Sequence, residues 1–344
     1  MVIIADIKAS GTEKASVLVK IARGCFKNQT PQRICAYVHM LMQRRSQKYG
    51  GKNMFTVSCE STIDLPGEYI HARNCTTLSY SYFVDGEEHV DDMDTSKEHL
   101  DAFYQVLKTK RPTTSLICQA AYTEYFEQLL EKGDVLHIAF GSGMSQSVAN
   151  AFLAQKALSG KYPDRKFYVV DSTCSSAGYG LIVDDALDMR DQGKSIEEIY
   201  AWLNMSARRV HHQFFSTDLS YFKRSGRVSG PAALFGTLFG ICPIMHLNYD
   251  GKIIAYAKTL GKKKAIKYTL AEICAHIENG ADYDKKIFIS HSDCPETAET
   301  VKEMLAEAFP KAKEIRIVNI GPIIACHCGP GTTAVYFWGD ERTK

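Results

Sequence analysis

The segment DVLHIAFGSGMSQSVANAFLAQKAL, residues 134–158, contains one complete unit of the expected fold. Residues 134–140 form a short, almost continuous apolar run, which is typical of a strand that is covered on both faces of a parallel sheet. The turn GSGMSQS follows, and VANAFLAQKAL then has the composition of a helix. This order of strand, loop and helix predicts an α/β fold with a parallel sheet covered by helices.

The same order recurs on both sides of this segment. MFTVS predicts a strand before the loop CESTIDLP, and KFYVVDS (166–172) predicts another before the loop TCSSAGYG and a helix that ends near Gly193. After about residue 213 the pattern changes to two strands around an Asp250-Gly251 turn, followed by further helices and strands. We therefore expect two α/β domains, residues 54–213 and residues 214–344.

Residues 1–53 are expected to form a helical N-terminal extension. Thr30 and Pro31 have the chemistry of a helix N-cap and first helical position, and apolar residues then recur at helical spacing up to Gly50-Gly51. The opposite side of this helix is basic. Two interpretations stay open: a helix packed on the body with a solvated basic side, or a docking or dimer surface.

The composition is that of a globular protein with a substantial core. The chain has 344 residues, of which 45% are hydrophobic and 23% are charged, with a formal net charge of +2. Because no basic tract is interleaved with aromatic residues, nucleic acid is not an expected partner. The longest apolar stretch, residues 230–247, is short and is broken by Pro243, so no integral membrane segment is expected.

The N-terminus and the cysteines indicate a cytoplasmic protein. The first residues, MVIIADIKASGTEK, lack the basic and apolar regions of a signal peptide. The eleven cysteines are an odd number and include no CxxC pair. We therefore expect reduced thiols rather than a disulfide framework.

Four loops that follow predicted strands are similar in composition: ESTIDLP, PTTSLI, GSGMSQS and DSTCSSAG. In open α/β sheets, ligands bind where the carboxyl ends of strands pass into helices. Hydroxyl groups and backbone amides can bind an anionic head group there without a full balancing charge. These loops contain almost no residue that could act as a general base.

Known enzyme motifs do not fit these loops. GSGMSQS is neither a GxSxG nucleophile elbow nor a P-loop, and it matches only half of the dinucleotide fingerprint. A Ser-His-Asp hydrolase with Ser145 and His327 stays formally open. A serine-dependent lipid hydrolase or acyltransferase is therefore the alternative function.

The segment GPIIACHCGPG (321–331) holds His327 between Cys326 and Cys328. In an extended chain, adjacent side chains point to opposite faces, so these three residues cannot close one tetrahedral metal site. We expect no metal and no cofactor, and we interpret the thiols as packing residues. A loop rich in Gly and Pro favours a His327 that faces a cleft, with a structural histidine as the alternative. The acidic stretch 84–94 is expected to be a solvated hairpin, since it lacks the ligand register of a calcium loop.

Taken together, the motifs resemble the DegV family. ESTIDLP, TTSLIC, GSGMSQS, VVDSTCSSAGYG, YFKRSGRVSG, KKKAI and IGPIIACHCGPG follow one another over about residues 54–340. The resemblance implies a bacterial two-domain α/β protein with a long-chain fatty acid between its domains. It also implies an acyl-carrying subunit with no complete active site, which presents the carboxylate to a separate ATP-binding fatty acid kinase subunit.

The resemblance also implies which residues contact the ligand. Thr114, Ser115 and Ser145 would hydrogen-bond the carboxylate, and His327 would be the remaining head-group contact. Secondary candidates for the ligand site are Ser61, Thr62, Ser142 and Gly143. Arg227 and Arg224 are either solvated surface charges or part of a surface that faces the partner or the phosphate. The apolar residues 231–245 would line the tunnel for the acyl tail, or else form ordinary core.

The chain departs from the family pattern at a few positions. Glu60 replaces an aspartate, Cys118 takes a hydroxyl position, and Gln146 replaces a glycine. Leu260 stands where an arginine is common, which leaves the lysines of KKK as the nearby cations. Lysine cannot reproduce the bidentate fork of arginine.

Overall fold

The computed structural model describes residues 55–229 and 240–344, and residues 55–344 form one compact unit. The predicted N-terminal extension lies outside the described residues, as does most of the apolar run proposed for the acyl tunnel. Among the helices that are described, none combines the length and the apolar character needed to cross a bilayer.

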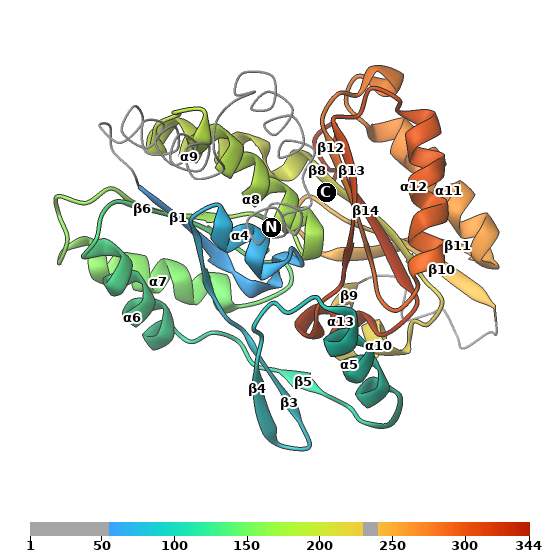
Figure 1. The fold of residues 1–344 in the computed structure, drawn as a ribbon, viewed down its shortest axis with the longest axis horizontal. Coiled ribbons are helices and arrows are strands. Elements are labelled where there is room, and N and C mark those ends of the chain that lie inside the picture. The colour runs from blue at the N-terminus through green and yellow to red at the C-terminus, as the bar shows by residue number, and fades with distance from the viewer. Residues whose placement is uncertain (1–54, 230–239) are drawn as a thin grey trace, which may run out of the picture. The chain divides into compact units, whose positions relative to one another are not determined.

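The first half of the unit is built on a four-stranded parallel sheet, as predicted (Figure 1). The strand order is β2-β1-β6-β7, with β1 Thr56–Glu60, β2 Cys75–Leu78, β6 Val135–Ala139 and β7 Phe167–Asp171. Every residue of β6 is buried. This continuous burial is what coverage of both sheet faces requires, and it explains the unbroken apolar run in the sequence.

Helices follow the strands of this sheet in the expected order. They are α4 Gly67–Ala72, α6 Gln119–Leu130, α7 Ser147–Ser159, α8 Ser176–Asp191 and α9 Ile196–Ser206, with short 3-10 turns at Ser61–Ile63 and Ala207–Arg209. Helix α8 begins five residues before the predicted start at Leu181, so half of the predicted TCSSAGYG loop is helical. Its first turns contain Gly178 and Gly180, which are poor helix formers and made that stretch resemble a loop.

The second half is built on a seven-stranded mixed sheet in the order β13-β12-β14-β8-β10-β11-β9. The strands are β8 Val210–Ser216, β9 Val228–Ser229, β10 Ile241–Leu247, β11 Ile253–Leu260, β12 Lys286–His291, β13 Glu314–Asn319 and β14 Thr332–Trp338. The hairpin around Asp250-Gly251 is confirmed as β10 and β11. The proposed boundary near residue 214 falls inside β8, which pairs with β14 and β10 of this second sheet.

The helices of the second half include the predicted one near 295–308. They are α10 Ser220–Ser225, α11 Lys262–His276, α12 Pro295–Ala308 and α13 Pro322–Cys328, with a 3-10 turn at Gly280–Asp282. His327 therefore lies in the last turn of a helix, and the predicted Gly- and Pro-rich loop was wrong. Gly321 occupies the N-cap position and Pro322 the first turn, where a missing N–H costs nothing.

A small antiparallel sheet, β4-β3-β5, extends from the first half (Figure 1). It comprises β3 Ser81–Val84, β4 Glu87–Val90 and β5 Thr113–Thr114, and helix α5 Lys97–Thr109 connects β4 to β5. Of the acidic stretch 84–94, predicted to be a solvated hairpin, the part up to Val90 forms one, with Asp85 and Gly86 in its turn. Asp91 and Met93 are buried beyond it, so the prediction was wrong for that end. Strands β3 and β5 and helix α5 all contact α13, so this small sheet brings Thr114 to His327.

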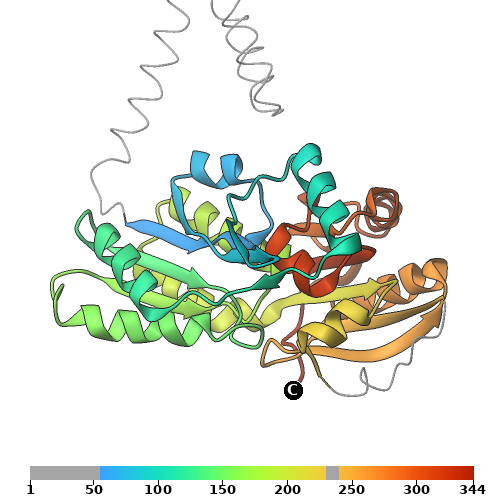
Figure 2. The ribbon, with the colours of Figure 1, turned by 90° about the horizontal axis from the view of Figure 1, so that it is seen from below.

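Helix α8 joins the two large sheets, because it contacts the 3-10 turn after β1 as well as β8, β12 and β14. A Cβ atom on Gly178 would lie 2.3 Å from His212 Nε2, so only glycine allows this approach. Lys286 of β12 is buried and binds Asp184 of α8 at 2.6 Å and Asp185 at 2.7 Å. These ion pairs fix α8 to the second sheet. Figure 2 shows the ribbon of these elements from below.

Candidate functional site

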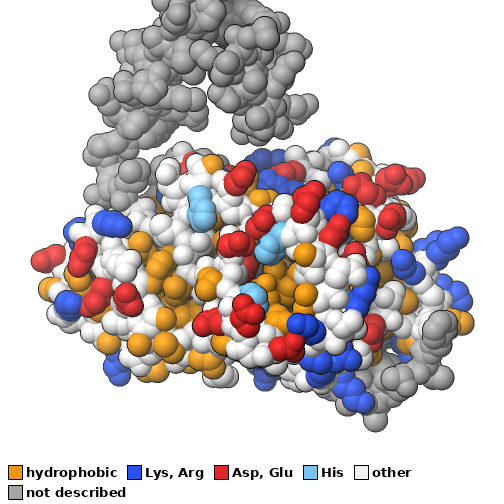
Figure 3. Space-filling view, turned by 60° about the horizontal axis from the view of Figure 1, so that its bottom comes forward, with side chains coloured by type: hydrophobic (Ala, Val, Ile, Leu, Met, Phe, Trp, Pro, Cys, Tyr) orange, Lys and Arg blue, Asp and Glu red, His pale blue; other side chains and the backbone are white. Residues whose placement is uncertain are grey.

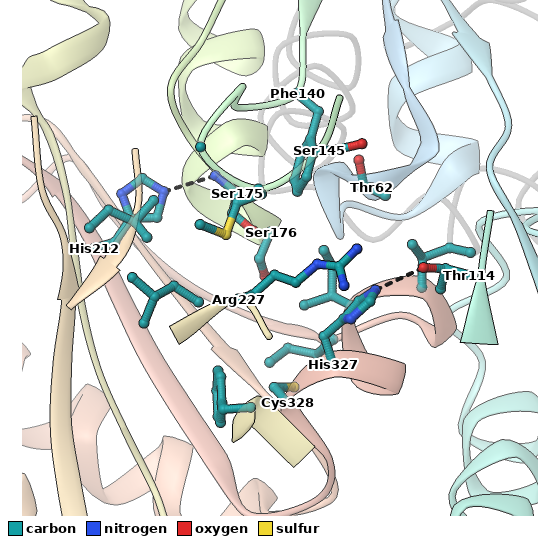
Figure 4. A pocket seen from close by; sticks show the side chains of 18 of the residues that line it. Thr62, Thr114, Phe140, Ser145, Ser175, Ser176, His212, Arg227, His327 and Cys328 are labelled. Atoms are coloured by element: carbon teal, nitrogen blue, oxygen red, sulfur yellow. Dashed lines mark hydrogen bonds between the residues drawn. The ribbon is translucent and has the colours of Figure 1, made fainter. Parts of the chain in front are cut away.

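A pocket of about 430 Å³ opens between the two halves of the unit (Figure 4). Its walls come from the ends of β5 and β6, the start of α8, strands β8 and β14, and helix α13. The loops after β5 and β6 and the start of α8 were the hydroxyl-rich segments that the sequence pointed to. The topology thus brings separate loops to one cavity, as expected for the carboxyl ends of parallel strands.

The structure brings most of the predicted site residues together. Eight of them line the pocket: Thr114, Ser115, Ser145, His327, Thr62, Ser142, Gly143 and Arg227. Two do not. Ser61 is buried beside the cavity, where its hydroxyl accepts a hydrogen bond from Tyr80 N at 3.1 Å. The Arg224 guanidinium lies over the Tyr221 ring, 4.4 Å from its centroid.

His327 and Thr114 form the central polar contact of the pocket. His327 Nε2 lies 2.9 Å from Thr114 Oγ1, and the two side chains point toward each other from α13 and β5 (Figure 4). Either atom can be the donor, depending on the imidazole tautomer. The contact joins residues 213 positions apart in the sequence, so it exists only when the small sheet packs against α13.

The His327 imidazole is neutral near pH 7. Burial, with a smaller contribution from the positive charges of Arg227 and Arg224, lowers its pKa to about 4. Arg227 extends beside His327 in the pocket (Figure 4). The neutral imidazole of His327 can form a hydrogen bond, and the neighbouring Arg227 carries a positive charge. An anionic group in the pocket could interact with both.

Three polar atoms of pocket residues are buried and lack a hydrogen-bond partner among the described residues. They are Thr62 Oγ1, Tyr80 Oη and His327 Nδ1. A buried polar group without a partner costs about 1–3 kcal/mol, so native proteins rarely leave several in one place. Their convergence on one cavity indicates a site for a polar group. Tyr80 was missed by the sequence analysis because it lies outside the hydroxyl-rich loops.

Ser145 sits in a loop whose shape depends on glycine. Its hydroxyl donates to Ser147 Oγ at 3.0 Å and accepts from Ser147 N at 3.2 Å. A Cβ on Gly143 would lie 2.4 Å from the carbonyl carbon of Gly251, in the turn between β10 and β11. Gly143 therefore lets this loop pack on the second half of the unit. This is a structural role, in addition to the predicted role in the ligand site.

A large part of the remaining pocket lining is apolar. Aromatic and aliphatic side chains from both halves contribute to it: Phe140, Phe214, Phe222, Leu247, Ile253 and Ile323. Lys252 is a second cation in the lining, beside Arg227. On the face seen in Figure 3, acidic and basic side chains are interspersed, and hydrophobic side chains gather between them.

The thiols beside His327 are buried in the last turns of α13. Burial raises the pKa of Cys326 to about 12 and also raises that of Cys328. Both side chains are therefore neutral near pH 7. Both cysteines lie in helix α13, so the prediction of an extended chain at residues 326–328 was wrong.

Glu60, which departs from the family pattern, points into the core of the first half. Its carboxylate accepts hydrogen bonds from Tyr122 Oη at 2.6 Å and Phe140 N at 2.9 Å, and it pairs with His137 Nε2 at 3.0 Å. Burial raises the pKa of Glu60, but His137 and the tyrosine hydroxyls outweigh this effect and lower it overall. Glu60 is thus a buried structural anion.

Among residues 55–229 and 240–344, neither Ser145 nor Ser58 forms an exposed Ser-His-acid triad. Ser145 is bonded to Ser147 rather than to His327. Ser58 Oγ lies 2.9 Å from His137 Nδ1, and His137 contacts Glu60, which is the order of a Ser-His-acid chain. All three side chains have 0% exposure and none of them lines the pocket, so no substrate reaches Ser58.

Comparisons with known proteins agree with this architecture. The model of the DegV family, described as uncharacterised proteins, matches residues 54–340. A DegV domain-containing protein of Clostridium perfringens is 36% identical over 290 residues, which cover 84% of this chain and 98% of that protein.

Solved structures share the two-domain α/β fold. A DegV family protein from Thermus thermophilus, described for its fatty acid binding, has a TM-score of 0.73 at 26% identity and covers 83% of this chain and 100% of its own. The fatty acid kinase B3 protein of Streptococcus pneumoniae, solved with linoleic acid, has a TM-score of 0.71 at 18% identity, with 83% of this chain and 100% of that chain covered. The second likeness concerns the fold alone.

Proposed function

The chain belongs to the DegV family, and from that premise we propose that it binds a long-chain fatty acid in the pocket. The carboxylate lies among Thr114, Ser115, Ser145 and His327, and the acyl tail lies against the apolar walls. The observation that carries this proposal is the combination of unpartnered buried polar atoms and an apolar remainder in one cavity. Such a cavity suits an amphipathic ligand.

The pairing of His327 with Thr114 explains how a hydroxyl is aimed at an anion. When Nε2 of the neutral imidazole carries the proton, it donates to Thr114 Oγ1. The Thr114 hydroxyl proton is then free to donate to a carboxylate oxygen. His327 is in this sense a positioning residue for Thr114, and Arg227 supplies the opposite charge nearby. Charge-assisted hydrogen bonds of this kind are about twice as strong as neutral ones.

We further propose that the protein presents this carboxylate to a separate ATP-dependent fatty acid kinase subunit. It would need no cofactor and no catalytic residue of its own. The fatty acid kinase B3 protein has this fold. Arg227 lines the pocket and is exposed, so a partner could reach it, whereas His327 is mostly buried. The fully buried Ser58 weighs against the alternative, a serine-dependent lipid hydrolase or acyltransferase.

The first test is mass spectrometry of the purified protein, native and after organic extraction. We expect a stoichiometric fatty acid. A protein that stays empty after incubation with a panel of fatty acids, but reacts with a fluorophosphonate probe, would favour the hydrolase alternative.

The second test is substitution at the polar contact. Thr114→Val keeps the side-chain shape and removes one charge-assisted hydrogen bond, so fatty acid affinity should fall by roughly 10- to 150-fold. His327→Ala should also weaken binding while leaving the fold intact. Thr123→Val, at a partly exposed position of α6 outside the pocket, is the matched control and should bind normally. Unchanged affinity in both pocket variants would contradict the assignment of the head-group site.

A further inference from the structure

Three potential metal ligands converge outside the pocket. His211 lies in β8, His276 is the last residue of α11, and Asp340 follows β14. One ligand atom from each lies within 4.8 Å of the other two. His211 Nε2 is 2.9 Å from Asp340 Oδ1, and His276 Nδ1 is 3.2 Å from the same oxygen. None of the three residues lines the pocket described above.

These separations match those around a tetrahedral ion. Zinc binds histidine nitrogen and carboxylate oxygen at about 2.0–2.1 Å, which puts neighbouring ligand atoms about 3.3 Å apart. The two nitrogen–oxygen distances already lie within a few tenths of an ångström of this value. The His211 and His276 rings are stacked at an interplanar angle of 21°, so one imidazole must rotate before both nitrogens can face the same ion.

The backbone holds the three residues in place. Asp340 N donates to His276 O at 3.1 Å, and Gly339 N donates to Arg209 O at 2.9 Å. A Cβ on Gly339 would lie 2.3 Å from His276 O and 2.8 Å from His211 Cδ2. The two histidines and the aspartate can meet only because residue 339 has no side chain.

The surroundings of the histidines resemble the outer shell of a metal site. Glu272 lies one turn before His276 on α11, with Oε2 4.0 Å from the outer nitrogen Nε2. A carboxylate that accepts a hydrogen bond from the outer nitrogen orients a ligating imidazole, and Glu272 would need to move about 1 Å closer to His276 to do so. The His211 ring stacks between His276 and Phe337, with centroid distances of 5.1 Å and 5.2 Å. The Asp340 side chain is 59% exposed, which leaves one side open for a water ligand.

We propose that His211, His276 and Asp340 bind one zinc ion, with water as the fourth ligand and Glu272 orienting His276. Two imidazoles and one carboxylate suit zinc better than magnesium or calcium, which prefer oxygen ligands. The ion ties the C-terminal end of α11 to strands β8 and β14. The site acts as a clamp within the second half of the unit and is independent of the proposed fatty acid binding.

The test is zinc titration of the full-length protein after removal of metal with a chelator. We expect one equivalent of Zn²⁺ to bind, and His276→Gln and Asp340→Asn each to weaken binding by at least about tenfold. Glu272→Gln should weaken it less than either ligand substitution. His99→Gln is the matched control, because His99 also faces a carboxylate, Asp94, at 3.9 Å. Equal affinity in the His99 and His276 variants would overturn the proposal.

Cobalt distinguishes this site from the cysteines. Co²⁺ at a site of nitrogen and oxygen ligands gives visible bands without a thiolate charge-transfer band, whereas binding at the free thiols gives that band. A thiolate band at one equivalent would place the metal elsewhere and refute the site. Zinc should also raise the Tm of the native chain and leave that of Asp340→Asn unchanged, because a ligand that binds the folded state stabilises it.

Discussion

The carboxyl group of Asp64 contacts the N-terminus of helix α13, and its pKa allows this contact to be tested quantitatively. Its carboxyl is 5% exposed, accepts a hydrogen bond from Gly321 N at 2.9 Å, and is bonded to the Ser176 hydroxyl. Gly321 is the N-cap of α13, the helix that carries His327. Burial raises the pKa of Asp64 from its ordinary value of 3.8 to about 8, although both hydrogen bonds act in the opposite direction.

This pKa predicts a dependence of stability on pH. Between the two values the folded state holds a proton on Asp64 that the unfolded state has lost. The free energy of unfolding should therefore fall by about 1.36 kcal/mol for each pH unit as the pH rises. Asp64→Asn removes this titration and keeps an acceptor for Gly321 N. Asparagine also tolerates the left-handed backbone at this position, where φ is 50°.

The assay is urea unfolding of the native chain and of Asp64→Asn at about pH 5 and about pH 7. The stability difference between them should change by about 2.7 kcal/mol over these two pH units, in favour of the variant at the higher pH. The other titrating groups cancel in this comparison. Asp293→Asn is the control, since Asp293 also has a left-handed backbone, with φ of 52°, but is exposed. If the difference in free energy of unfolding between the native chain and Asp64→Asn does not vary with pH, Asp64 is not protonated in the folded state.

Three further predictions follow from other contacts. Gly143→Ala should lower the free energy of unfolding by about 1–3 kcal/mol because its Cβ would meet the backbone of Gly251; denaturant unfolding with normal stability would contradict the packing of this loop. Glu60→Gln should cost about 3–5 kcal/mol, since it leaves the buried His137 without its anion; calorimetry that finds no loss of stability would show that this pair is dispensable. Arg227→Ala should slow phosphorylation of the bound fatty acid by a kinase subunit in a coupled assay by a larger factor than it weakens fatty acid binding, because Arg227 lines the pocket and is also exposed; an equal rate at saturating fatty acid would remove Arg227 from the partner surface.

Regular periodicity made most of the fold predictable. The buried strand β6 and the helix after it could be read from an apolar run and its loop, because strands covered on both faces have few polar residues. The predictions failed where local signals and tertiary packing conflict. Helix α8 starts at Ser176, with φ of 53° and glycines in its first turns, because α8 must approach His212 and Ile63 closely.

The site was predictable as a set of motifs but not as a geometry. The hydroxyl-rich loops identified Thr114 and Ser145, but nothing local to His327 indicated a seven-residue helix. Tyr80 could not be found, since its hydroxyl reaches the pocket from a segment without a motif. The cluster of His211 and Asp340 joins positions 129 residues apart, and only the pairing of β8 with β14 brings them together.

The distance along the chain between Thr114 and His327 has a consequence during protein synthesis. Thr114 and His327 are 213 residues apart, so His327 is made long after Thr114. The four-stranded sheet and the hydroxyl-rich loops can form on the ribosome before α13 emerges. A nascent chain therefore lacks the contact between Thr114 and His327 until α13 has been made. Closing so long a loop is slow, so this contact forms late and reports that the small sheet and α13 have packed together.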